Sequence, residues 1–241
     1  MKAIIDLVLL GILILCVWAG YKKGLLMGIA GILCIVISVY GANLLSNAFS
    51  YDVVPALRPF ISGYTESMLK TGDTPVRQEM GWEDYDLTAE DLLAQYPERK
   101  AEFCTACFRA VGVSSPAAEH LADKAIAYAE DNGGTVTNAV VHTLSSTISY
   151  VMCFTLAFLL ILIILTVIGN LPNLSYKLPN LDLVNDIGGA VLGLVRGLLF
   201  CALLVWLLKF LGIILGQDTL ADSTLGGWLL KRDFFFKYLG I

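Results

Sequence analysis

The chain has 241 residues, of which 57% are hydrophobic and only 15% are charged. Soluble domains are about half apolar and about a quarter charged, so this composition, with a mean hydropathy of +0.73, indicates a membrane protein. The net charge of −5 is concentrated in residues 47–147, which hold fifteen acidic and seven basic side chains. This acidity argues against nucleic acid or an anionic membrane surface as the partner of that segment.

The N-terminal part of the chain predicts a transmembrane hairpin. Residues 3–20 are apolar apart from Asp6, and residues 25–45 form a second apolar stretch. About 20 apolar residues suffice for a helix that crosses a bilayer. A cleaved signal peptide is the competing interpretation of the first stretch, but no small-x-small cleavage site follows it. Three glycines recur every four residues, at Gly20, Gly24 and Gly28. They either allow close helix packing or break the helix at the turn.

Residues 47–147 predict a small helical domain or a set of helices on the bilayer surface. Residues 72–86 are acidic and rich in turn formers, which is typical of a loop. Thr88 is expected to cap a helix that ends at Gln95, and residues 98–111 predict another. Ser115 and the following proline begin a helix that should stop at Asn132–Gly134. Prolines punctuate the segment at Pro55, Pro59, Pro75 and Pro97.

Two further crossings are predicted at residues 148–168 and 185–215. In the second of these, Gly189, Gly193 and Gly197 line one helix face, because residues four apart are neighbours on a helix. Arg196 falls on the same face, so we expect a packing surface that contains a buried charge. The remaining tail mixes aromatic and basic residues, which is typical of an interfacial helix.

Lys22 and Lys23 lie in a short link beside two predicted helix ends, where basic residues favour the cytoplasm most strongly. Lys177 lies in the other short link. We therefore expect both links inside the cell, with both termini and the acidic segment outside. The chain then divides into a transmembrane hairpin at 1–46, an acidic extracytoplasmic helical segment at 47–147, two transmembrane helices at 148–215 and an interfacial amphipathic tail at 216–241.

Asp6 and Arg196 form the first candidate site, an intramembrane charge pair. Asp6 lies about 21 Å above the cytoplasmic end of its helix, and Arg196 lies about 10 Å above the end of its own. The long arginine side chain can span much of this difference in depth. The sequence allows three interpretations: a structural pair that fixes helix register, a proton or ion relay, or an Asp6 that reaches interfacial water. Lys209 is at a similar depth but is expected to extend outward.

Cys104 and Cys107 form the second candidate site, a CxxC motif. Cysteines three residues apart share a helix face, so packing, a disulfide or redox pair, and metal binding are the alternatives. His120 follows at zinc-finger spacing, but His142 is too distant for that motif. The sequence contains no nucleophile elbow, phosphate loop or HExxH motif, so neither an enzyme nor a cofactor is expected.

The joint order of these features resembles the colicin V production protein (CvpA) family of bacterial inner-membrane proteins. The resemblance rests on an early aspartate, a glycine-flanked basic corner, a final helix of the form N-x-x-x-G-x-x-x-G-x-x-R-G and an aromatic tail. The matching residues are Asp6, Gly20, Lys22, Lys23, Gly24, Asn185, Gly189, Gly193, Arg196, Gly197, Ser223 and the run from Phe234 to Tyr238. The longer acidic segment lies outside the resemblance.

The resemblance implies four transmembrane helices in an all-α fold in the bacterial plasma membrane, and a role in bacteriocin production or export and in envelope maintenance. The leading hypothesis is a non-enzymatic scaffold or accessory protein that presents the acidic segment to an envelope protein partner. The alternatives are a small transporter or channel subunit with a polar path at Asp6 and Arg196, or a thiol-redox protein that uses Cys104 and Cys107. Self-association through the glycine faces is a further expectation.

Overall fold

A computed structural model describes residues 2–70, 74–170, 182–210 and 223–230. Every regular element in these ranges is a helix, which agrees with the predicted all-α class. The chain divides into two compact units. The first comprises Met1–Ala48, Val151–Leu207 and Leu220–Ile241, and the second comprises Phe49–Tyr150 and Leu208–Thr219.

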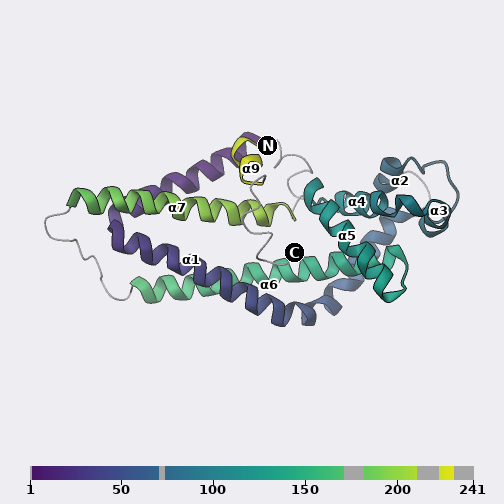
Figure 1. The fold of residues 1–241 in the computed structure, drawn as a ribbon, viewed down its shortest axis with the longest axis horizontal. Helices are drawn as coiled ribbons and strands as arrows, with labels where there is room; N and C mark the ends of the chain where they lie inside the picture. The colour runs from purple at the N-terminus through teal and green to yellow at the C-terminus, as the bar shows by residue number, and fades with distance from the viewer. Residues whose placement is uncertain (1, 71–73, 171–181, 211–222, 231–241) are drawn as a thin grey trace. The chain divides into compact units, whose positions relative to one another are not determined.

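The first unit is built from long apolar helices (Figure 1). Among the described residues, three helices are long and apolar enough to cross a membrane, over Ala3–Leu69, Val136–Ile168 and Leu183–Leu208. Many of their large aliphatic side chains are exposed, as expected for surfaces that face lipid rather than water. The helices of this unit are α1 (Lys2–Leu69), α6 (Val136–Asn170), α7 (Asp182–Leu208) and the short α9 (Thr224–Leu230), of which α1 and α6 continue into the second unit.

A break at Gly24 divides α1. The backbone there has φ 77° and ψ 177°, a conformation that glycine adopts readily and other residues rarely do. In Figure 1 the purple first arm of α1 is followed by a second arm that runs back in the reverse direction. The structure therefore places a helix break within the glycine-flanked basic corner.

The helical structure extends further than the sequence predicted. Residues 47–69 were assigned to the acidic segment, but α1 continues through Pro55 and Pro59 to Leu69. A proline removes one backbone donor and usually bends a helix, so it is a weak boundary signal where the flanking residues favour helix. The two prolines are four residues apart, so both interruptions fall on the same helix face.

The second unit contains the short helices of the central segment. Thr88 caps its helix by accepting a hydrogen bond from the backbone N–H of Asp91, and Gly133 ends another in the left-handed conformation, so both predictions are confirmed. The prediction of a loop over residues 72–86 is wrong in part, because Pro75 begins a helical turn. The elements are α2 (Pro75–Met80), α3 (Ala89–Gln95), η1 (Pro97–Arg99), α4 (Lys100–Ala110) and α5 (Ser115–Asn132).

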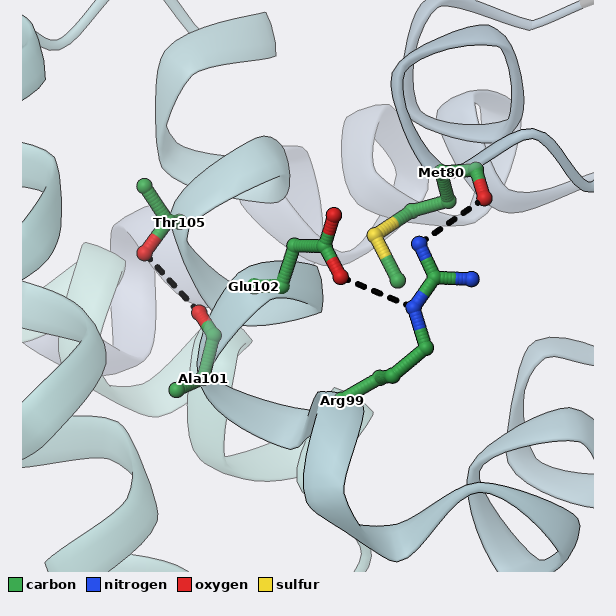
Figure 2. Close-up of polar contacts among 5 residues, drawn as sticks. All are labelled: Met80, Arg99, Ala101, Glu102 and Thr105. Carbon is green, nitrogen blue, oxygen red and sulfur yellow. Dashed lines mark hydrogen bonds and ion pairs between the residues drawn. The ribbon is translucent and has the colours of Figure 1, made fainter.

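Two arginines hold the turns of this unit. Arg77 is 2% exposed and donates to the carbonyls of Trp82, Tyr85 and Leu87, so it fixes the irregular segment after α2. Arg99 joins η1 to its neighbours, as Figure 2 shows. Its Nε donates to a carboxylate oxygen of Glu102 at 2.8 Å, and its Nη2 donates to the carbonyl of Met80 at 3.0 Å.

Some predictions lie outside the described residues. These concern the link with Lys177, residues 211–215 of the fourth predicted crossing, and the tail beyond Leu230 with Lys231, Arg232 and Lys237.

Candidate functional site

The contact between the first arm of α1 and α7 is made of glycines. A Cβ added to Gly189 would lie 2.9 Å from the Cα of Gly24 and would overlap the carbonyl oxygen of Gly20. A Cβ added to Gly20 would lie 2.9 Å from the Cα of Gly193. Real Cβ atoms do not approach backbone this closely, so the two helices meet backbone to backbone. The glycine face of α7 is thus covered by α1 of the same chain.

Asn185 links α7 to the break in α1. Its side chain is 4% exposed, and its Oδ1 accepts the backbone N–H of Leu25 at 3.0 Å. The first N–H groups after a break have no partner within the helix, so the asparagine acts as a cap supplied by another helix. A Cβ on Gly24 would lie 2.7 Å from the same oxygen. The break and its cap therefore require a glycine opposite an asparagine.

Arg196 lies beside the second arm of α1. A Cβ on Gly31 would lie 2.9 Å from its Nη1, so this glycine leaves room for the guanidinium. The guanidinium carbon also lies 5.7 Å from the ring centroid of Phe200, within the range of a cation–π interaction. Gly197 faces the first arm, where a Cβ would lie 3.1 Å from the Cβ of Cys16.

Asp6 caps α9. Its two carboxylate oxygens accept the backbone N–H groups of Thr224 at 3.0 Å and Leu225 at 2.9 Å, which are the first two residues of that helix. A carboxylate at a helix N-terminus both satisfies free donors and interacts favourably with the helix dipole. This contact ties the beginning of the chain to residues near its end.

The structure does not bring Asp6 and Arg196 together. Within the parts of the chain that it describes, no ion pair or hydrogen bond joins them, and each side chain has the separate surroundings given above. Lys209, expected to extend outward, is instead 1% exposed, with its ammonium 4.9 Å from the ring centroid of Phe210. Its backbone carbonyl accepts the N–H of Ser114, which places it in the second unit.

Cys104 and Cys107 lie on the buried face of α4. Both are free thiols, with exposures of 0% and 2%. Burial raises the pKa of Cys104 to about 12, and it raises the pKa of Cys107 well above its ordinary value. The reactive form of a cysteine is the thiolate, which these surroundings disfavour, so the geometry favours packing over redox chemistry. The described residues contain no cluster of three or more metal-ligating side chains.

An apolar cavity of about 320 Å³ is a feature that sequence reasoning missed. Aromatic side chains of α6 and α7 form much of its wall, with Phe154 edge-on to Trp206 at 5.1 Å and Phe158 edge-on to Phe200 at 6.4 Å. The four-residue spacing of Phe154 and Phe158 was a signal for a shared face. It could not show that α7 meets that face.

Comparison with known proteins gives one match. No curated protein and no solved structure matches the chain. The family described as colicin V production protein matches residues 101–232, which include α4 apart from its first residue, α5 and the whole Asn185–Gly197 motif. The match begins inside the segment that the sequence resemblance left out, and it does not extend to Asp6 or Gly20. Because it covers more than half of the 241 residues, the chain belongs to the colicin V production protein family.

Proposed function

We propose that this protein is a non-enzymatic membrane scaffold or accessory factor that supports bacteriocin production or export and envelope maintenance. Family membership and the three apolar helices support a membrane protein of colicin V production. The observation that carries the scaffold proposal is the α1–α7 contact, where Asn185, Gly189 and Gly193 of the matched range meet the glycine corner of α1 in a helix junction. None of these residues forms a reactive cluster with another, and their contacts serve packing and capping.

We further propose four crossings, because the Gly24 break divides α1 into an arm of residues 2–23 and an arm that begins at Leu25. Each arm is long enough to span about 30 Å of hydrocarbon at about 1.5 Å per residue. Both termini and residues 47–147 then lie outside the cytoplasm, with Lys22 and Lys23 inside, as the basic residues favour.

A cysteine-accessibility experiment tests this topology in intact cells. Cys104 and Cys107 are buried and make poor reporters, so the variants are Lys22→Cys in the corner and Glu119→Cys on the exposed face of α5, with the unaltered chain as background. A membrane-impermeant maleimide should label the Glu119→Cys variant at once and the Lys22→Cys variant only after the cells are opened. The reverse result would invert the topology, and labelling of both in intact cells would rule out a crossing between them.

The cellular role is tested by complementation. A bacterium lacking the chain should release less active bacteriocin, and the unaltered chain should restore release. Gly189→Leu should fail to restore it, because the added side chain would enter the backbone contact, whereas Gly11→Leu should restore it, because a Cβ on Gly11 meets nothing within 4 Å. Equal restoration by both variants would show that the junction is not needed, and normal release without the chain would refute the role itself.

A further inference from the structure

A small cavity lies where Arg196 faces the second arm of α1. Its volume is about 50 Å³, and α1, α6 and α7 all contribute to its wall. The lining residues are Lys23, Met27, Ala30, Gly31, Cys34, Leu165, Thr166 and Arg196. All of these residues belong to the first unit, so the cavity is a feature of the membrane helices themselves.

The cavity is positively charged. Lys23 and Arg196 both line it, and no carboxylate among the described residues does. Neither cation forms an ion pair with any residue that the structure describes. The Nε of Arg196 is buried and has no hydrogen-bond partner within those parts of the chain. A buried donor without a partner is unfavourable, and a cation within membrane helices more so, so this arrangement calls for an anion.

Gly31 keeps the guanidinium at this position. A Cβ there would lie 2.9 Å from Nη1 and 3.3 Å from the Cδ of Arg196, so any larger residue would displace the side chain. The guanidinium carbon is also 5.7 Å from the ring centroid of Phe200, on its own helix α7. The guanidinium is therefore held between two helices, with donors available to a ligand and little freedom to move away.

We propose that this cavity binds the phosphate group of an anionic ligand, supplied either by a lipid headgroup or by free phosphate. Arginine donates to phosphate through two parallel N–H groups, and lysine adds a point charge. One ordered water needs about 10–15 Å³ of such space, so the cavity has room for about four oxygen atoms, the number in a phosphate. The Thr166 hydroxyl lines the same space, and the side chains of Met27 and Leu165 offer apolar contact to an acyl chain.

The test measures binding to the purified full chain in an uncharged detergent. The probes are short-chain phosphatidylglycerol, short-chain phosphatidylcholine and inorganic phosphate, each titrated by calorimetry. Lys23→Gln and Arg196→Gln should each weaken the binding of phosphatidylglycerol about tenfold, which corresponds to about 1.4 kcal/mol. Lys22→Gln is the matched control, because the Lys22 ammonium lies 4.0 Å from the ring centroid of Trp18 and does not line the cavity.

The outcomes separate the two sources of phosphate. Tighter binding of phosphatidylglycerol than of inorganic phosphate identifies a lipid headgroup, and equal binding identifies phosphate itself. Equal losses in Lys22→Gln and Lys23→Gln would overturn the site, as would binding of phosphatidylglycerol no tighter than that of phosphatidylcholine together with no binding of phosphate. Lys23 is exposed, so Lys23→Gln should fold. Its binding of phosphatidylglycerol therefore tests the site even where Arg196→Gln does not fold.

Discussion

Replacement of Gly189 by alanine tests the backbone contact between α1 and α7. The new methyl carbon would lie 2.9 Å from the Cα of Gly24 and would overlap the carbonyl oxygen of Gly20. Carbon atoms pack best at about 3.5–4.0 Å, so the helices must separate by roughly an ångström near this position. The atoms in the way are backbone and cannot rotate aside, unlike the end of a flexible side chain.

The expected free energy combines two opposing terms. Overpacking of a close contact costs about 1–3 kcal/mol. Alanine also favours helix over glycine by about 1 kcal/mol, which offsets part of that loss. Gly11→Ala gains the same helix propensity but introduces no clash, because a Cβ on Gly11 meets no atom within 4 Å. The difference between the two variants therefore isolates the steric effect, at about 1–3 kcal/mol.

The assay is reversible denaturation of the purified chain in mixed micelles, with helicity and tryptophan fluorescence as parallel probes. Gly189→Ala should unfold at lower denaturant than the unaltered chain, and Gly11→Ala at the same or higher denaturant. If the two variants unfold together, the backbone contact does not stabilise the fold and the reasoning from the glycine geometry is refuted.

Four further predictions each concern one side chain. Asn185→Ala should destabilise the chain by about 1–2 kcal/mol in the same assay, because it leaves the partly buried N–H of Leu25 without its acceptor. Asp6→Ala should accelerate amide hydrogen exchange at the first two residues of α9, because the Asp6 carboxylate accepts hydrogen bonds from both N–H groups. Unchanged exchange would contradict the cap. Cys104 should react with a maleimide about three orders of magnitude more slowly in the native than in the denatured chain, because burial raises its pKa to about 12. The ion pair with Arg99 lowers the pKa of Glu102 below its ordinary 4.5, so it stabilises the fold above that pH and the effect is lost as the pH falls through the lowered value. Glu102→Gln should therefore be less stable than the unaltered chain at pH 7 and equally stable in acid; a constant difference at all pH values would disprove the ionic contribution.

Local signals predicted most of the short helices. The Thr88 cap, the Ser115–Pro116 start and the Gly133 stop depend on neighbours within a few residues, and the structure has helix boundaries at each. The failures occurred where a local signal was overridden. Residues 47–69 were placed in the acidic segment that prolines punctuate, but α1 continues through Pro55 and Pro59, because the loss of one donor does not end a helix whose other residues favour it.

The contacts of the site depend on residues far apart in the chain, which a single sequence does not reveal. Glycine spacing indicates that a helix face carries small residues, but it does not indicate which helix packs against that face. Asp6 illustrates the limit, because a charge in an apolar stretch suggests an opposite charge as its partner. The structure instead gives it two backbone N–H groups more than two hundred residues away. Backbone donors carry no sequence signal, so Thr224 and Leu225 could not be identified in advance.

The spacing of the Asn185–Gly197 motif follows from the requirements of the break in α1. A helix break frees N–H groups that need an acceptor, and the N–H of Leu25 is partly buried here. Asn185 provides an acceptor only if α7 comes very close, and that approach requires glycines at the next two turns, where Gly189 and Gly193 lie. Arg196 comes one turn later, where α7 faces Gly31 on the second arm. One junction therefore accounts for the spacing of these residues.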